Sequence, residues 1–430
     1  MWLGSPRACG VSGIRSRLTT LVALAVGAAP GFLLPVVITW KLPVVSGAAL
    51  ILAVSLTQIA YNAIAAAHET TVLVNLGRLY GADAQVSRIS FGPLMSRAVT
   101  RVGPVLLGSA TVLVLAAGLL SPDISIGLLF LLYLPLLAGL ILQVATTSLS
   151  AYLYVSRRLP SVYVANVFLG GPSVICVLVW QDPFVVSIVY AAGQALRWAF
   201  LSWRVQATQR GAAVADDAVV ESPTWRELSP QVVSSAAGQA MPVLVQALLT
   251  IAGAEAVAIG AIALRVWGAA WQVGVSTLAM PETVTLTRRL SEFRSAARTR
   301  WLDRRAMHLA AATLGVTGLG VGAVWLVAFA FADDLPAAIA SGLLWSIVAL
   351  LGLPGGMLGF WAGRGLVAVR AGVWLPLMIV IAFIVGALVC LLTVPTLGGL
   401  GALVAQACAF TAQGVATYWM FRRMAAQEQD

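Results

Sequence analysis

The sequence is poor in charged residues, and this scarcity indicates whether the protein folds in water or in a membrane. Charged residues make up 10% of the 430 positions, whereas hydrophobic residues make up 60%. A soluble domain carries roughly 25% charged residues, which help to cover its surface. The composition therefore excludes an ordinary soluble globule and indicates a protein that lives in lipid. The net charge of +10 does not indicate nucleic acid binding, because the basic residues fall in short connections between apolar runs.

Apolar runs of about 20 residues or more are long enough to cross roughly 30 Å of hydrocarbon. They lack the polar alternation of barrel strands, and lipid cannot satisfy free backbone amides, so they predict helices. The expected fold class is an all-α integral membrane protein of about twelve transmembrane helices. The runs lie near residues 20–40, 43–67, 99–121, 124–153, 161–181, 184–204, 231–252, 256–279, 306–332, 335–361, 372–393 and 396–420.

Short connections and missing motifs exclude several kinds of enzyme. The predicted external connections are too short to hold an extracytoplasmic catalytic domain, and no phosphate-binding Gly-Lys-Ser/Thr motif is present. The cysteines Cys9, Cys176, Cys390 and Cys408 show neither disulfide nor metal-ligand spacing, so we expect free thiols. We therefore predict a protein that is not an enzyme and that has no cofactor and no metal site.

Basic residues predict that both termini lie in the cytoplasm. With a cytoplasmic amino terminus, 23 of the 26 Lys and Arg residues fall in the tails or in the inner connections. The positive-inside rule favours this orientation, so we expect a multi-pass protein of the cytoplasmic membrane. The other three are Lys41 in the first external connection, and Arg197 and Arg265 inside predicted spans.

The two arginines inside spans are the main candidates for a binding site. Arg265 lies about ten residues from Glu255, near 15 Å deep in span eight by helical rise. Placing it there costs on the order of 3 kcal/mol. We expect Arg265 to face a polar cavity and contact substrate, with a structural bond to neighbouring helices as the alternative. Arg197 lies near the cytoplasmic end of span six, where it could snorkel out, so a structural role is favoured over substrate contact.

Carboxylates are missing from the middle of every predicted span, and both histidines, His68 and His308, fall at predicted cytoplasmic helix ends. A proton or sodium pump that works through a buried carboxylate needs such an acid, and so does a site for cationic drugs. Acyl transfer through an intramembrane histidine lacks its residue as well. A cavity whose only charges are arginines suits an anion.

Features that recur at half the chain length predict two related halves. Pro30 and Pro242 are separated by 212 positions, as are Arg158 and Arg370. Many transporters are built from two such repeats, so we expect two pseudo-symmetric six-helix bundles around a central cavity. The connections after spans two and eight, near 68–98 and 280–305, predict amphipathic helices on the inner surface. The predicted boundaries are a cytoplasmic tail 1–19, a bundle 20–204, a cytoplasmic linker 205–230, a bundle 231–420 and a cytoplasmic tail 421–430.

Glycine and proline interrupt spans one and seven. Span one reads Gly27-Ala-Ala-Pro30-Gly31, and span seven reads Gly238-Gln-Ala-Met-Pro242. Matching interruptions point to a central site and to hinges at Pro30, Gly31, Gly238 and Pro242, with ordinary proline kinks as the alternative. Amides within the spans form helix-to-helix hydrogen bonds by default, but sugar hydroxyls would use the same groups. The candidate amides for substrate binding are Gln194, Gln239 and Gln272.

One stretch of the second half resembles a segment of polysaccharide-export flippases. Residues 253–290 read GAEAVAIGAIALRVWGAAWQVGVSTLAMPETVTLTRRL, in which a short external turn leads through a Val-x-x-Gly helix to a proline at the inner face. The plan of six plus six helices, with long inner connections after spans two and eight, covers nearly the whole chain. Both features are similar to the multidrug/oligosaccharidyl-lipid/polysaccharide (MOP) exporter superfamily, and the segment to its polysaccharide-transporter branch.

The resemblance implies alternating access of two bundles that carries a polyprenyl-diphosphate-linked oligosaccharide to the outer leaflet. In the related lipid II flippases, cavity arginines contact the diphosphate, and one on span eight matches Arg265. The implied partners are membrane lipid, the anionic lipid-linked sugar and polysaccharide-assembly proteins. Two other functions stay open: a small-molecule or multidrug antiporter, and a non-transporting scaffold of a polymer-synthesis complex.

Overall fold

The computed structural model describes residues 11–80, 90–156, 158–210, 223–275, 278, 295–331, 333–369 and 371–427, and every regular element in these ranges is a helix. The helices of the first half are α1 (Val11–Lys41), α2 (Val44–Tyr80), α3 (Phe91–Leu120), α4 (Ile126–Val155), α5 (Leu159–Ala165), α6 (Val167–Trp180) and α7 (Pro183–Gln209). Those of the second half are α8 (Trp225–Ile251), α9 (Ala254–Gly274), α11 (Ser295–Ala330), α12 (Ala337–Leu350), α13 (Leu353–Ala368), the short 3-10 helix η3 (Gly372–Trp374), α14 (Leu375–Leu397) and α15 (Gly399–Gln427).

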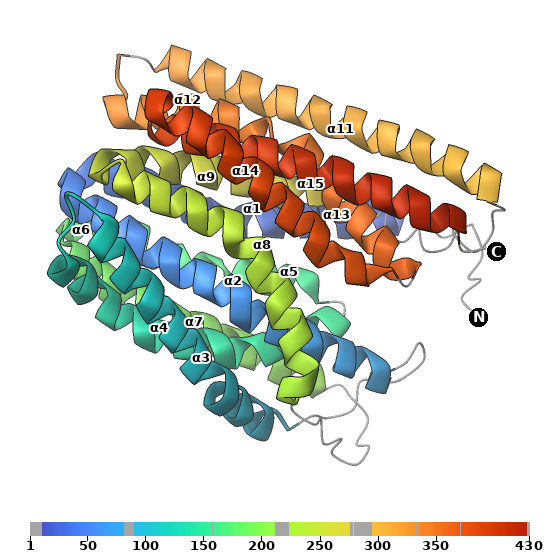
Figure 1. The fold of residues 1–430 in the computed structure, drawn as a ribbon. Helices are drawn as coiled ribbons and strands as arrows, with labels where there is room; N and C mark the ends of the chain where they lie inside the picture. The colour runs from blue at the N-terminus through green and yellow to red at the C-terminus, as the bar shows by residue number, and fades with distance from the viewer. Residues whose placement is uncertain are drawn as a thin grey trace.

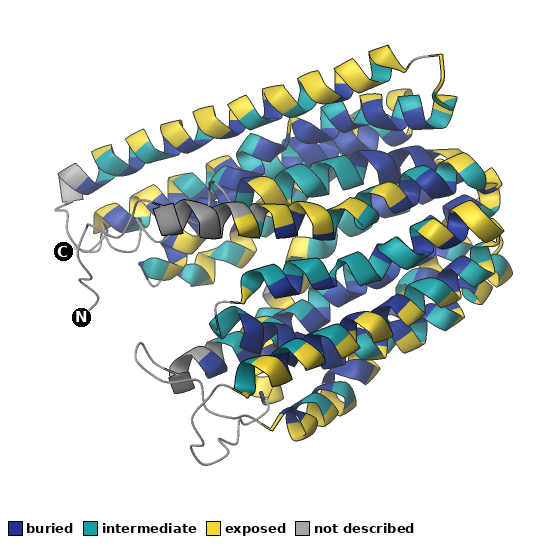
Figure 2. Cartoon of the chain, turned by 180° about the vertical axis from the view of Figure 1, so that it is seen from behind, coloured by how far each residue is buried: buried dark blue, intermediate teal, exposed yellow. Residues whose placement is uncertain are grey.

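By length and composition, 11 helical segments of the described chain could each cross a membrane, and the bent pair α12–α13 makes a twelfth. The first half includes one interrupted span, in which α5 and α6 follow one another across Asn166. Exposed side chains on the outer faces are apolar: Leu314, Leu319 and Phe329 of α11 are examples. Figure 2 shows this helix exposed along its outer face. The predicted all-α membrane fold of about twelve spans is confirmed.

The helices form two lobes, with α2–α7 in one and α9 and α11–α15 in the other, while α1 and α8 lie between them (Figure 1). The packing partners repeat after six spans. In the first lobe α4 packs against α2, α3 and α7; in the second the α12–α13 span packs against α9, α11 and α15. Helix α1 also contacts α9, and α8 contacts α2, so the first helix of each bundle reaches the other bundle. This is the expected two-bundle architecture.

Local signals set several helix ends. Asp182 precedes Pro183 at the start of α7, and its Oδ1 accepts hydrogen bonds from the backbone N–H groups of Phe184 (2.8 Å) and Val185 (3.2 Å). Asp123, in the connection between α3 and α4, accepts a hydrogen bond from the N–H of Ala254 at 3.0 Å. That bond joins the two halves at the start of α9, the helix that carries Arg265.

The helix α2 is longer than the apolar run predicts. The run was expected to end at residue 67, but α2 continues to Tyr80, and α3 already begins at Phe91. The prediction of a surface helix over 68–98 is therefore wrong for two parts of that range: residues 68–80 extend α2, and residues 91–98 begin α3. Of its counterpart over 280–305, residues 280–294 lie outside the described residues and 295–305 begin α11. The extension places His68 and its neighbour Glu69 inside a helix, not at its end.

The spans α13 and α15 make direct backbone contact through glycine. Gly355 and Gly359 lie one turn apart on α13, and Gly414 of α15 faces them. A Cβ on Gly414 would lie 2.2 Å from the carbonyl oxygen of Gly355. Small residues allow such close approach in a membrane, where helices associate by packing and not by leaving water.

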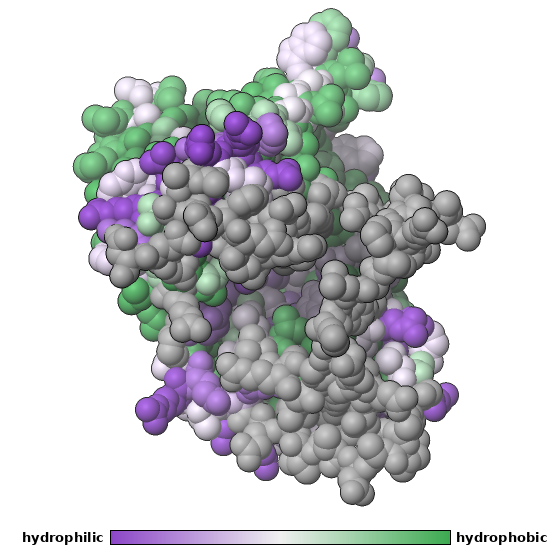
Figure 3. All heavy atoms as spheres, turned by 90° about the vertical axis from the view of Figure 1, so that its right-hand side faces the viewer, coloured by the Kyte–Doolittle hydropathy of each residue, from purple (hydrophilic) through white to green (hydrophobic). Residues whose placement is uncertain are grey.

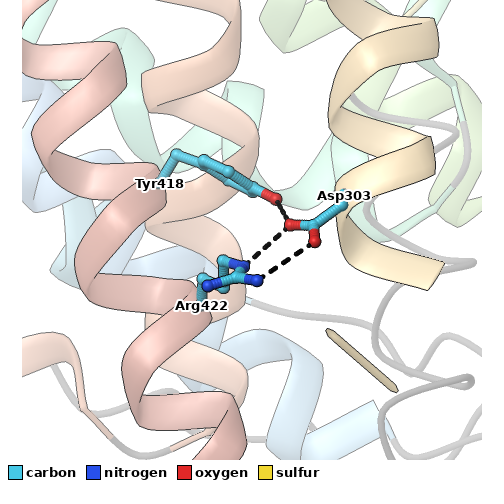
Figure 4. Close-up of polar contacts among 3 residues, drawn as sticks. All are labelled: Asp303, Tyr418 and Arg422. Atoms are coloured by element: carbon cyan, nitrogen blue, oxygen red, sulfur yellow. Dashed lines mark hydrogen bonds and ion pairs between the residues drawn. The ribbon is translucent and has the colours of Figure 1, made fainter. Parts of the chain in front are cut away.

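A polar contact fastens α11 to α15 at the end of the molecule where α11 begins and α15 ends, the end on which hydrophilic residues gather (Figures 1, 3 and 4). The Asp303 carboxylate of α11 accepts hydrogen bonds from the Tyr418 hydroxyl and from Arg422, whose Nε lies at 2.9 Å and Nη2 at 3.3 Å. Beside it, Nη1 of Arg298 donates to the carbonyl oxygen of Ala425 at 3.1 Å. These bonds add to the apolar contacts that Leu302, Ala306 and Leu309 of α11 make with the core of the second bundle.

Replacing Gly414 by valine should destabilise the second bundle. The added side chain meets backbone and cannot be accommodated by a rotamer change, so we expect a loss of about 1 to 3 kcal/mol or more. Gly318→Val is the matched control, because a Cβ there has no neighbour within 4 Å. Thermal unfolding of the purified protein in detergent measures both variants. Equal midpoints for the two would contradict the packing.

Candidate functional site

Three adjoining cavities lie between the two bundles. The central cavity, of about 420 Å³, is lined by α1, α2, α8, α9 and α15. The arginine cavity, of about 310 Å³, shares Gln58, Leu264 and Arg265 with it and extends toward α4–α7. The glutamate cavity, of about 280 Å³, adjoins the second and shares Arg197 and Gln272 with it. Both lobes contribute to each cavity, as expected for a site that two bundles enclose.

Arg265 lies where the central and arginine cavities meet. It stands in the middle of the 21-residue helix α9, about 16 Å by helical rise from Ala254. Its guanidinium forms no hydrogen bond or ion pair with any described residue. The structure thus places Arg265 against a cavity, as expected, and shows no bond of the structural kind that was the alternative. Its role in binding stays a prediction.

Arg197 lines the arginine and glutamate cavities. The expectation that it snorkels to the interface is wrong, because α7 continues for about three more turns to Gln209. The side chain is only 7% exposed, and its Nε has no partner. Its guanidinium instead interacts with the Tyr61 hydroxyl and the Glu69 carboxylate of α2. The two span arginines, one from each bundle, therefore face the same cavity.

Glu69 is the residue that the sequence analysis missed. It lies in the extended part of α2 and lines the glutamate cavity with Tyr154, Tyr163 and Arg197. The Tyr61 hydroxyl donates to its Oε2 at 3.4 Å. The prediction that the spans hold no carboxylate is therefore wrong, because Glu69 lies within the membrane-spanning helix α2. Among the described lining residues, two arginines and one glutamate carry charge, so the cavities keep a positive balance.

The signal for Glu69 was available in the sequence. Residues 62–76 contain neither glycine nor proline and are rich in alanine, so nothing ends the helix at the His68–Glu69 pair. Hydropathy places the end of the span at this polar pair, because it cannot distinguish a water-facing helix end from a cavity wall. His68 is buried as well, and its Nδ1 lies 2.9 Å from the Thr147 hydroxyl of α4.

Amides and aromatic rings cover much of the remaining wall. Of the candidate amides, Gln239 lines the central cavity and Gln272 lines the arginine and glutamate cavities. Gln194 is not among the residues that line these cavities; it is buried against Gly139 of α4. Further amides on the central cavity are Gln58, Asn62, Gln246 and Gln406. The ring of Trp267 stacks on those of Trp271 and Phe410 in the same wall, with centroids 5.4 and 4.9 Å apart.

Solved structures of membrane transporters share this architecture, although the sequence matches no known family profile and no curated protein. A structure of MATE in complex with MaL6 matches with a TM-score of 0.63 and 15% identity, covering 96% of this chain and 97% of that one. The lipid II flippase MurJ in its inward closed conformation matches with a TM-score of 0.63 and 11% identity, over 96% and 90%. The fold is that of MATE and MurJ.

A third match is an outward-facing multidrug resistance MATE family transporter of the MOP superfamily, with a TM-score of 0.56 and 13% identity over 96% of both chains. At sequence identities this low, the matches show a shared fold and not a shared function. The expected likeness to the MOP superfamily is thus confirmed at the level of architecture, and the polysaccharide-transporter branch stays a prediction.

Within this MATE and MurJ fold, the two helices that reach across the bundles carry matching interruptions. Proline removes the hydrogen bond to the carbonyl four residues earlier. Pro35 therefore leaves the carbonyl of Gly31 without its helical hydrogen bond, and Pro242 does the same for the carbonyl of Gly238. Gly31, Pro35, Gly238 and Pro242 all line the central or arginine cavity. Pro30 does not; it packs against Gly170 of α6. Figure 1 shows α8 bent about midway along its length. The matched pair in α1 is therefore Gly31–Pro35, and hinge motion stays a prediction.

Arg197 and Glu69 should be energetically coupled. Arg197→Gln alone leaves the carboxylate in the cavity without its cation, and Glu69→Gln alone leaves the guanidinium without its anion. The double variant should lose less stability than the two single losses together, by about 1 kcal/mol. Thermal and denaturant unfolding in detergent measure this difference. Strict additivity would show that the two charges do not interact.

Proposed function

We propose that the protein is a flippase that moves a polyprenyl-diphosphate-linked oligosaccharide across the cytoplasmic membrane for polysaccharide biosynthesis. The observation that carries this proposal is the Arg265 guanidinium, which lies on a cavity at mid-span without a hydrogen bond or ion pair to any described residue. A charge at that depth is costly unless something compensates it. An anionic substrate group supplies the compensation.

A diphosphate suits this site by geometry as well as by charge. Guanidinium groups bind phosphoryl oxygens through paired N–H donors, and such charge-assisted bonds are stronger than neutral ones. Arg265 and Arg197 belong to different bundles but line one cavity. A group with several anionic oxygens can therefore contact both bundles, and its binding would favour their closure. This supports alternating access, with the termini and the basic connections on the cytoplasmic side.

The remaining wall supports a sugar as the rest of the headgroup. Carboxamides of Gln58, Gln239 and Gln406 offer both donors and acceptors to hydroxyl groups. The stacked rings of Trp267, Trp271 and Phe410 present apolar faces beside them. A mostly apolar wall with a few convergent polar groups is typical of small-molecule sites.

Arg265→Gln should abolish most translocation. The amide keeps the polarity of the site but removes the charge, so we expect transport of a fluorescent polyprenyl-diphosphate sugar in proteoliposomes to fall by about tenfold to a hundredfold, equivalent to the loss of a charge-assisted bond. Arg265→Lys should retain part of the activity. Gln194→Leu is the control, since Gln194 lies away from the described cavity walls.

Full transport by a folded Arg265→Gln protein would overturn the proposal. Absence of transport in the unaltered protein, together with retained binding to polymer-synthesis proteins, would instead favour the scaffold.

A second candidate function is a multidrug antiporter, and Glu69 is the observation that favours it. A carboxylate on a cavity within the spans can bind a proton or a cationic compound in turn. Its surroundings include the Tyr61, Tyr154 and Tyr163 hydroxyls and the Arg197 guanidinium. The nearby cation competes with a cationic drug for Glu69, which is why we place this function second.

The Glu69→Gln variant separates the two functions. An antiporter should export a cationic dye from vesicles in response to a proton gradient, and the variant should lose that response because its amide does not titrate. A flippase should show no gradient-dependent dye export, while the variant retains at least part of its lipid-linked sugar transport. Dye export that survives in Glu69→Gln would exclude Glu69 as the coupling group.

A further inference from the structure

A fourth cavity, which we call the apolar pocket, adjoins the central cavity within the second bundle. It measures about 180 Å³ and shares Gly238, Trp271 and Phe410 with the central cavity. Among the described lining residues, Gln413 supplies the one carboxamide. The remaining lining consists of Ala237, Met241, Gly356, Gly359, Phe360, Ile379, Ala382, Phe383 and Ala409. A sugar would find almost no partners for its hydroxyls there, and unpaired polar groups are costly to bury.

The equivalent place in the first bundle, between α1 and the span formed by α5 and α6, is the arginine cavity, which Arg197 and other polar residues line. Beside this cavity α1 packs directly on that span: a Cβ on Gly27 would lie 2.0 Å from the carbonyl oxygen of Tyr163, and one on Gly170 would lie 3.0 Å from the backbone of Pro30. Its counterpart in the second bundle is the pair α8 and α14. These helices meet at Gly386, where a Cβ would lie 2.7 Å from the Met241 sulfur. Beside that contact they enclose the apolar pocket.

The outer wall of the pocket is a helix that faces lipid. Helix α14 has the highest mean hydropathy of the spans in the described chain. Its face away from the pocket is exposed and apolar, as at Val380, Ile384 and Leu388. Its inner face supplies Ile379, Ala382 and Phe383 to the pocket. The pocket is therefore one helix removed from the hydrocarbon, and it connects inward to the site of Arg265.

We propose that the apolar pocket between α8 and α14 binds the first isoprenoid units of the lipid carrier while the diphosphate lies at Arg265. This inference rests on the proposed function and names where the lipid part of the substrate goes. Trp271 lines both cavities and lies six positions after Arg265 on α9, about 9 Å by helical rise. A chain that starts at the diphosphate reaches the pocket within that span. Aromatic rings and the flexible thioether of Met241 suit a branched, unsaturated chain.

The isoprenoid chain can enter the apolar pocket from the central cavity beside Gly238 of α8. A Cβ on Gly238 would meet nothing within 4 Å, so the helix has free space where the two cavities join. Pro242 breaks the helix hydrogen bond to the same residue. The two bundles then bind different parts of the substrate: the polar arginine cavity beside α1 faces the headgroup, and the apolar pocket beside α8 holds the lipid.

Binding of farnesyl diphosphate and of inorganic diphosphate to the full-length purified protein tests the inference. The unaltered protein should bind farnesyl diphosphate more tightly than inorganic diphosphate. Ala382→Phe fills the pocket with a ring, and it should weaken farnesyl diphosphate by roughly tenfold, since several buried carbons are displaced. It should leave inorganic diphosphate unchanged. Ile384→Phe, on the exposed face of the same helix, is the matched control and should change neither.

The outcomes separate this inference from the proposed function. If Ala382→Phe keeps the full preference for farnesyl diphosphate, the pocket is not the chain site, although the anion site stands. If the unaltered protein binds neither probe, or if Arg265→Gln binds both as well as the unaltered protein does, the proposed anion site fails first. Ala237→Leu approaches the pocket from α8 and replaces Ala382→Phe if that variant does not fold. A preference lost in it supports the inference, and a preference kept overturns it.

Discussion

The structure depends on one costly placement, a guanidinium at the middle of a membrane helix. Arg265 is acceptable there only because two bundles keep a cavity open beside it and line that cavity with amides. The close helix contacts through Gly355 and Gly414 lie elsewhere, inside the second bundle. The largest hydrophobic core joins α2–α4 of the first bundle to α8, α9 and α15 of the second, so the two bundles also pack directly against each other beside the cavities.

The second span arginine is compensated differently. Glu69 and Tyr61 of α2 lie within electrostatic range of Arg197, so a carboxylate of the first bundle opposes its charge. Arg265 forms no ion pair with any described residue, and the balance there is left to a ligand. The same residue type thus has two roles, which depend on the helix opposite it and not on depth alone. An anion that reaches both groups would compete with Glu69 for Arg197.

The two bundles are related in their packing but differ at the helices that cross between them. Helix α1 faces the polar arginine cavity beside α6, whereas α8 faces the apolar pocket beside α14. Both carry a glycine four residues before a proline, at Gly31–Pro35 and Gly238–Pro242. A Cβ on either glycine would meet nothing within 4 Å, so both weakened helices have room to bend at this point. We infer that the two halves have diverged around one substrate with a polar and an apolar part.

The sequence by itself determined the solvent, the helical class, the number of spans and the two-bundle plan, because hydrocarbon thickness and backbone hydrogen bonding leave few other solutions. It also singled out Arg265, since a charge in an apolar run stands out by its cost. Tertiary structure decided which polar groups share a cavity. Helix ends defined by hydropathy placed Glu69 outside its span and Arg197 near an interface, because an apolar count cannot register a polar wall between helices. Gln194 and Gln239 look alike in sequence, but only rotation within the bundle turns the second toward the site.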